Sequence, residues 1–229
     1  MEKLKDILEK YNLNDKDIEI IIYSIGNIYN HFEFQKRMRN FPHHGELSLG
    51  LHIIEVVVMT YKLGKKKLNS NDLNVALKIA AMHDLFTYPW QNNPLSANKK
   101  FFNRHGFAHP VEAVINSYTW FKEEYNDDAD IIIDGIIHHM YPLPVIVINS
   151  DDNTRELYNF DLYQRLPKNI KELIKKSSNR NKFLNLSWCR SKYVTGKIVS
   201  KADKKVSFTQ IKSFRSALAL ITGHNKELK

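Results

Sequence analysis

The chain has 229 residues, of which 43% are apolar and 26% charged, and this composition excludes a disordered, collagen-like or disulfide-rich protein. Cys189 is the only cysteine, so no internal disulfide can form and a reducing compartment is expected. The formal net charge of +9 would attract anions such as phosphates, nucleotides, nucleic acid or acidic lipid, but dispersed lysines are equally expected of a solvated cationic surface without such a partner. Because the lysines are dispersed and aromatic residues are not regularly interleaved with them, a nucleic-acid partner is possible but not favoured.

The N-terminal residues and the apolar runs bear on location. Residues 1–6 carry charges of both signs and no apolar run, so they do not predict a signal peptide. The longest apolar stretches, such as 56–59 and 131–133, are far too short to cross a bilayer. We therefore expect a cytoplasmic protein with no membrane partner.

The dominant periodicity in the first third is that of amphipathic helices. An apolar stripe over 4–11 predicts the first helix, and Asn14 can cap a second helix that continues toward Phe32. Ser48 can cap a third helix, which Gly64 would end from the C′ position. A fourth helix is predicted from Asn71 or Asp72 to residues 83–84.

The middle of the chain begins with a long connection. Residues 87–108 contain prolines, adjacent asparagines and a glycine that interrupt any period, and a loop of that length is often functional. Pro110 is expected at the first position of the next helix, with His109 at its cap and the helix running to Phe121. Another helix is predicted over about 128–140.

The last third is less regular. Residues 145–148 could form a short strand, a helical stretch is predicted near 168–176, and two helices are expected at about 189–203 and 207–221. We predict an all-α fold and a single domain over 1–229. Its core would cover about 35–143 and 189–221, with a peripheral insertion at about 145–190.

Histidine and aspartate residues are spaced along the chain in a way typical of metal sites. They are His52 on the third helix, the pair His83 and Asp84, then His109, and the pair His138 and His139. Neutral imidazole and carboxylate are suitable ligands for divalent transition metals, and ligands from several helices can converge inside a bundle. Each residue alone has a local explanation as a core histidine, a helix cap or a partner of a helix dipole. The metal hypothesis therefore depends on their joint order and spacing.

The order of these residues resembles the H…HD…D signature of the HD superfamily of metal-dependent phosphohydrolases. His52 lies in the phrase GLHIIEV, His83-Asp84 follows on the next helix, and Asp203 lies in SKADK. The phrases HGFAHP at 105–110 and HHMYPL at 138–143 are similar to those of a bacterial HD subfamily and contain the positions of the additional ligands of binuclear members. The resemblance covers about 35–143 and 189–215.

The resemblance implies two divalent metal ions per chain. His52, His83, Asp84 and Asp203 would hold one ion, and His109 with His138 or His139 would hold the second, with Asp84 bridging. Transition metals such as Mn or Fe are favoured, and Mg is possible although it prefers oxygen ligands. The implied reaction is hydrolysis of a small phosphomonoester or phosphodiester, nucleotide-like in kind, by a metal-activated hydroxide, with His83 and Asp84 as the catalytic pair.

The chain departs from the family pattern at several positions. The GYP motif of the cyclic-di-GMP hydrolases is absent and Thr87 replaces a lysine typical of them, so that activity is not expected. Leu51 and Ile53 replace the glutamate and serine that usually flank the first histidine. If Asp203 is not the last ligand, Asp134 is the nearest substitute.

The segment 145–190 is additional to the family pattern and separates Asp84 from Asp203. Because the ligand helices can assemble without it, we expect this segment to contribute no metal ligand. Its expected role is to cover the site or to contact another subunit of a homo-oligomer.

Cationic and imidazole groups near the expected site are candidates for binding a phosphate, which arginine can hold through two parallel hydrogen bonds. They are Arg39, His44, Arg104, His105 and Lys204. The stretch that contains the first two could equally be an ordinary basic connector. Two other functions stay open: an HD-type di-iron oxygenase, which would consume oxygen, and a non-catalytic nucleotide-binding module, which would bind its ligand without turnover.

Overall fold

The computed structural model describes residues 3–40, 48–87, 105–143, 160–178 and 189–210, and these form helices and turns without a strand, which confirms the all-α prediction. The first helices are α1 (Leu4–Glu9), α2 (Asp15–Asn30), α3 (Phe32–Asn40), α4 (Leu49–Gly64) and α5 (Ser70–Met82). After α7 (His105–Phe121) come two short 3-10 turns, η3 (Lys122–Glu124) and η4 (Asn126–Asp128), and α8 (Ala129–Ile137). The last are α10 (Phe160–Arg165), α11 (Lys168–Ser178) and α12 (Val194–Gln210).

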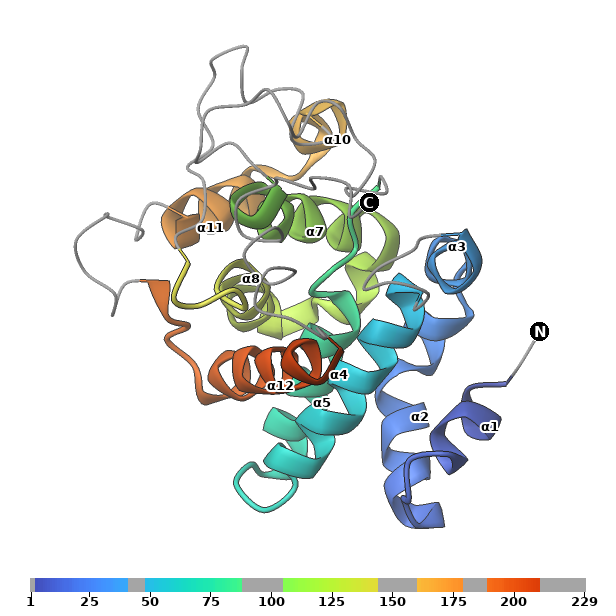
Figure 1. The fold of residues 1–229 in the computed structure, drawn as a ribbon. Coiled ribbons are helices and arrows are strands. Elements are labelled where there is room, and N and C mark those ends of the chain that lie inside the picture. Colours follow the sequence, from blue (N-terminus) through green and yellow to red (C-terminus); the bar gives the residue numbers. More distant parts are fainter. Residues whose placement is uncertain (1–2, 41–47, 88–104, 144–159, 179–188, 211–229) are drawn as a thin grey trace, which may run out of the picture.

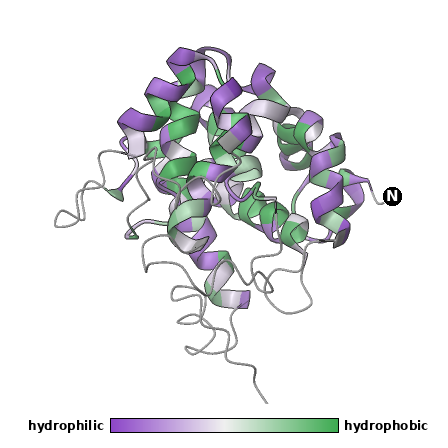
Figure 2. Cartoon of the chain, turned by 90° about the horizontal axis from the view of Figure 1, so that it is seen from above, coloured by the Kyte–Doolittle hydropathy of each residue, from purple (hydrophilic) through white to green (hydrophobic). Residues whose placement is uncertain are grey.

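Helices far apart in the sequence pack around one core. α12 lies against α4, α5 and α8, so the end of the described chain packs on its first half (Figure 1). α2 packs on α5, and α11 packs on α8. The helices are two-sided, with hydrophobic residues facing neighbouring helices and hydrophilic residues outside (Figure 2). This is the arrangement that the helical periodicity predicts.

The helix ends agree with the sequence in part. Asn14 and Ser48 are N-caps, since their side chains accept hydrogen bonds from backbone N–H groups at the start of α2 and α4. The cap of α5 is Asn69, slightly earlier than predicted. The role expected for Gly64 was wrong, because it is the last residue of α4 and not the residue beyond the helix end. A Cβ there would lie 3.0 Å from the Leu73 side chain, so the space around it is tight.

Two other expectations about helices were wrong. α7 begins at His105, so Pro110 lies inside the helix and His109 is not a cap; the missing proline N–H costs only one bond near the helix start. The break expected after residue 203 is absent, because the buried stripe of Val199, Ala202 and Val206 continues along α12. The strand expected at 145–148 and residues 211–221 lie outside the described residues.

The described part of the 145–190 segment belongs to the same core as the rest. Ile170 and Ile174 of α11 are buried, and Tyr163 and Leu166 join them from the α10 region. In Figure 1, α11 lies beside α8 and α7 and away from α4 and α5. Within the described ranges, no helix is both long enough and apolar enough to pass through a membrane.

Two glycines let α8 pack closely on its neighbours, Gly196 where α12 meets α8 and Gly135 where α8 meets Ile79 of α5. A Cβ on Gly196 would overlap the Ser191 side chain and lie 2.8 Å from the Cα of Gly135, and a Cβ on Gly135 would lie 2.7 Å from Ile79. Only glycine fits where two backbones approach so closely. The contact brings the end of α8, which precedes His139, near α12, which carries Asp203.

Candidate metal centre

Six buried side chains from five helical regions converge in the interior. They form three overlapping groups of three, and within each group the potential ligand atoms lie within 4.8 Å of one another. The residues are His52 on α4, His83 and Asp84 at the end of α5, His109 on α7, His139 just after α8, and Asp203 on α12. All six were predicted as ligands from the sequence, from positions up to 151 residues apart (203 − 52).

The carboxylate of Asp84 lies at the middle of the cluster. Its Oδ2 atom faces His52 and His83, whose Nε2 atoms lie 3.5 and 3.4 Å away. Its Oδ1 atom faces His109 and His139, at 3.2 and 3.4 Å from their Nε2 atoms. Each oxygen therefore faces a separate pair of imidazoles, which is the geometry of a carboxylate that could bridge two metal ions.

Asp203 completes one side of the cluster. Its Oδ1 atom lies 3.4 Å from Nε2 of His52 and 3.9 Å from Nε2 of His83. On the other side of Asp84, the Nε2 atoms of His109 and His139 are 3.0 Å apart. The Asp203 side thus combines two imidazoles with two carboxylates, and the other side combines two imidazoles with the shared Asp84.

Backbone and side-chain oxygens fix the orientation of three of these imidazoles. Nδ1 of His83 lies 2.7 Å from the carbonyl oxygen of Ala80, and Nδ1 of His139 lies 2.7 Å from that of Ile136. A carbonyl only accepts, so each Nδ1 carries the proton. Nδ1 of His52 lies 2.9 Å from Oε1 of Gln210, whose amide nitrogen donates to Glu55, so this Nδ1 also donates.

These assignments leave Nε2 lone pairs pointing at carboxylates, which fits a cation at the centre. Nε2 of His83 is fully buried and makes no hydrogen bond within the described residues, although carboxylate oxygens surround it. In a neutral imidazole whose Nδ1 is protonated, Nε2 has only a lone pair to offer. Lone pairs facing carboxylates repel unless a proton or a metal ion lies between them. The donor set therefore fits divalent metal ions that accept nitrogen and oxygen ligands.

In the absence of metal, protons take the place of that cation. Burial alone would lower the pKa of His83, but the adjacent Asp84 carboxylate and Asp203 raise it to about 9. Burial would raise the pKa of Asp84, but the charge on His83 and a hydrogen bond from His109 hold it well below its usual range. Burial lowers the pKa of His139 in spite of Asp84. One proton is therefore held strongly on the His83 side.

The turn that follows Asp84 is clamped by two neighbouring helices. Arg37 on α3 is fully buried and donates twice to the carbonyl oxygen of Phe86, at 2.9 and 2.5 Å. Asn116 on α7 donates to the carbonyl oxygen of Leu85 at 2.7 Å. Glu112 on α7 accepts from the backbone and side chain of Thr87 at 2.9 and 2.5 Å. These contacts fix the direction in which Asp84 leaves the end of α5.

Two predicted alternatives are placed outside the cluster. His138 donates through Nδ1 to the backbone oxygen of Asp134 at 2.8 Å and belongs to none of the three groups. His139 is thus the histidine of this pair that faces Asp84. The carboxylate of Asp134 accepts from Ser191 and from the backbone of Lys192 at 2.7 and 2.8 Å, so it serves as a junction between α8 and the start of α12.

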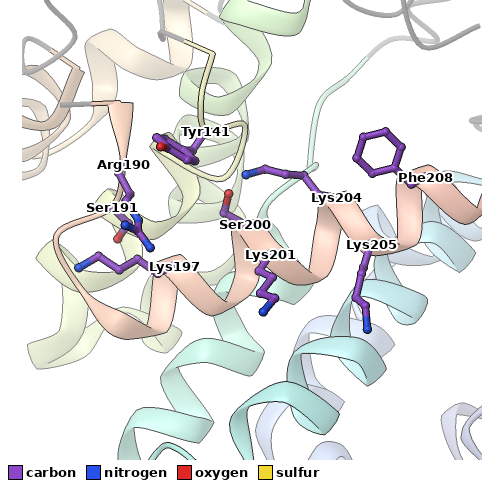
Figure 3. A pocket seen from close by; sticks show the side chains of 9 residues that line it. All are labelled: Tyr141, Arg190, Ser191, Lys197, Ser200, Lys201, Lys204, Lys205 and Phe208. Carbon is purple, nitrogen blue, oxygen red and sulfur yellow. The ribbon is translucent and has the colours of Figure 1, made fainter. Parts of the chain in front are cut away.

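The predicted phosphate-binding residues have mixed outcomes. Arg39 is exposed on α3. Lys204 follows Asp203 on α12, is half-buried, and has Nζ 4.7 Å from the centre of the Tyr141 ring (Figure 3). Burial lowers the pKa of Lys204, although Asp203 acts in the opposite direction. His44 and Arg104 lie outside the described residues, as does the side chain of His105.

Sequence reasoning missed the residues that orient the ligands. Arg37 was noticed only as a member of a basic stretch, and Gln210, Glu112 and Asn116 were not singled out. Glu112 and Asn116 follow His109 and lie on the same side of a helix, a spacing that could have indicated buried polar partners. Gln210 offered no such signal, because its partner His52 is 158 residues away.

Comparison with known protein families, with curated proteins and with solved structures finds no match. The chemistry of the cluster and of the surface around it is therefore what indicates a function.

Proposed function

We propose that this chain is a metal-dependent phosphohydrolase of the HD type, acting on a phosphomonoester or phosphodiester of a small, nucleotide-like substrate. The observation that carries the proposal is the placement of Asp84, whose two oxygens face separate pairs of imidazoles. A bridging carboxylate between two nitrogen-rich sites is the arrangement expected for two divalent ions a short distance apart.

The chain's residues have separable roles in this proposal. His52, His83 and Asp203 would hold one ion and His109 and His139 the other, with Asp84 shared. Two such ions, when bound, supply Lewis acidity toward phosphoryl oxygens and lower the pKa of a water molecule. Gln210 and the carbonyl of Ala80 keep the Nε2 lone pairs of His52 and His83 turned inward.

The surroundings of the cluster favour a phosphorylated substrate over the oxygenase alternative. Lys204 follows Asp203 directly, and both Lys204 and Arg190 lie over the Tyr141 ring, 4.7 and 5.8 Å from its centre (Figure 3). Cations that reach a phosphorylated substrate neutralise the charge that develops on a transferring phosphoryl group. An oxygenase acting on an uncharged substrate would gain nothing from them.

The test is a screen of phosphorylated metabolites with the Mn- or Fe-loaded protein, monitoring release of phosphate or of a shortened product. We expect metal-dependent release that chelation abolishes and metal restores. Oxygen consumption without phosphate release would instead identify an oxygenase. Ligand binding with no turnover under any metal condition would identify a non-catalytic module, and either result would reject the proposal.

A further inference from the structure

The outer side of α12, the helix that also carries Asp203, borders a concave surface feature. It has a volume of about 350 Å³, within the range of small-molecule sites, and lies between α12, the residues before it, and Tyr141 (Figure 3). Its cations are Arg190, Lys197, Lys201, Lys204 and Lys205. No aspartate or glutamate of the described residues lines this α12 pocket.

Three lysines of the α12 pocket have no carboxylate partner among the described residues. Lys197, Lys201 and Lys205 form no ion pair with a carboxylate in the part of the chain that the structure describes. Lys204 and Arg190 both lie over the Tyr141 ring, so cation–π contacts place two positive charges on the side of the pocket that Tyr141 forms. Gathering like charges around one hollow is unfavourable unless an anion binds between them.

A buried hydroxyl supplies an independent sign of a ligand. Ser200 is 4% exposed, and its Oγ atom has no hydrogen-bond partner among the described residues. Figure 3 shows this oxygen pointing from α12 toward the space between Tyr141 and Lys204. A buried hydroxyl without a partner is costly, and an anionic oxygen in the pocket would accept its hydrogen bond.

The spacing of the lysines indicates the size of the anion. Lys197, Lys201 and Lys205 recur at intervals of four along α12, so they follow one side of the helix for about 12 Å at 1.5 Å per residue. An orthophosphate ion can contact only one end of such a row. A chain of linked phosphates can contact the row along its length.

We propose that the α12 pocket binds the polyphosphate portion of the substrate, and that this protein acts on small molecules that carry two or more linked phosphates. The assignment of the anion to a substrate rests on the proposed function. Asp203 and Lys204 are consecutive on α12, so the same helix carries a residue of the metal cluster and a residue that lines the pocket. Phe208 is 72% exposed and also lines the pocket, where its ring can pack against an apolar or aromatic part of the same ligand.

The test measures binding of inorganic tripolyphosphate and of orthophosphate to the metal-loaded full chain by titration calorimetry. The test variant is Lys201→Met with Lys205→Met, since methionine keeps helix propensity and removes both charges. The control is Lys66→Met with Lys67→Met, two exposed lysines after α4 that change the net charge equally. We expect tripolyphosphate to bind about tenfold more weakly to the test variant and unchanged to the control, with little effect on orthophosphate.

Ser200→Ala gives a milder second variant that preserves shape, and we expect it also to weaken tripolyphosphate binding while circular dichroism stays unchanged. Equal weakening in the control, or unchanged binding in the test variant and Ser200→Ala, would overturn the proposal. So would a single-stranded oligonucleotide that binds through these lysines when tripolyphosphate does not, since that would assign the pocket to nucleic acid.

Hydrolysis of p-nitrophenyl phosphate separates the two proposals. Turnover of this monoester together with no effect of the lysine variants on tripolyphosphate would reject the polyphosphate pocket and retain the phosphohydrolase. Tripolyphosphate binding through α12 with no metal-dependent turnover of any phosphate ester would reject both the phosphohydrolase and the assignment of the anion to a substrate.

Discussion

Asp84 and Asp134 are both buried carboxylates beside a histidine, but their surroundings differ in kind. Asp134 accepts hydrogen bonds from Ser177 and Ser191 and from the backbone of Lys192, so groups that carry protons enclose it. Asp84 faces four imidazole nitrogens, and three of those rings use their Nδ1 proton elsewhere. The Asp134 junction is complete without a cation, whereas the Asp84 cluster needs a cation to balance its lone pairs.

Burial and a neighbouring histidine are therefore not enough to identify a metal ligand. His138 and His139 are adjacent and both buried, yet the first turns to the Asp134 junction and the second to Asp84. The two environments differ in whether hydrogen-bond donors point at the carboxylate, as they do at Asp134, or away from it, as they do around Asp84. The ligand assignment therefore depends on which nitrogen of each ring is left without a proton.

The largest expected effect comes from exchanging the carboxylate in each environment for an amide. Asp84→Asn should weaken metal binding by more than about a hundredfold and abolish turnover, because the shared ligand loses its charge. Asp134→Asn should keep both properties but lower the free energy of unfolding by about 2–3 kcal/mol, because donors then face an uncharged group. Metal analysis and urea unfolding of both variants check this; the reverse pattern would show that the two roles are exchanged.

The pH dependence of metal affinity sharpens the same comparison. The pKa of His83 is raised from 6.5 to about 9, so below pH 9 a metal ion must displace its proton. Metal affinity should rise about tenfold per pH unit up to that value. In the metal-free chain, the stability that this proton contributes is complete below pH 6.5 and is lost as pH rises through 9. Titration calorimetry between pH 6 and 9 checks this, and a pH-independent affinity would contradict it.

A smaller effect is expected from the partner of His52. Gln210→Leu removes the acceptor that orients this imidazole but leaves every ligand in place. Metal affinity should fall by about tenfold, the lower end of the range for such partners. Glu55, which accepts from Gln210, provides the matched variant Glu55→Gln, for which a smaller loss is expected. A loss in Glu55→Gln as large as in Gln210→Leu would assign the effect to the network as a whole.

The smallest effect concerns the side of α12 that meets α8. Gly196→Ala would push against Ser191, which donates to Asp134, and against the backbone of Gly135. We expect the free energy of unfolding to fall by about 1–3 kcal/mol through overpacking, with metal content unchanged. Thermal unfolding with and without added metal checks this. A loss of metal that exceeds the loss of stability would mean that the two environments are coupled through α12.

The sequence predicted those parts of the fold and of the site that depend on local pattern and order. The caps at Asn14 and Ser48 follow from short-range chemistry, and the predicted ligands His52, Asp84 and Asp203 do lie in one cluster. The position of Pro110 could not be predicted, because a frequent preference for the helix start is overridden when the helix extends backward.

Contacts between distant segments could not be predicted from the sequence. Arg37 donates hydrogen bonds to the carbonyl oxygen of Phe86, 49 positions away in the sequence. No local pattern distinguishes such an arginine from one that binds phosphate. The choice between His138 and His139 depends on which way each ring points after the last turn of α8, and α8 packs on several helices that are distant in the sequence. The α12 pocket likewise could not be predicted, because it forms only where the fold brings Tyr141 and Arg190 together beside α12.

The most direct test of the account is the number of metal ions bound per chain, measured by mass spectrometry of the elements in protein reconstituted with Mn or Fe. We predict about two ions per chain in the wild type, fewer than one in Asp84→Asn, and about two in Asp134→Asn. A wild-type chain that binds no transition metal after reconstitution would contradict the central claim that Asp84 bridges two ions.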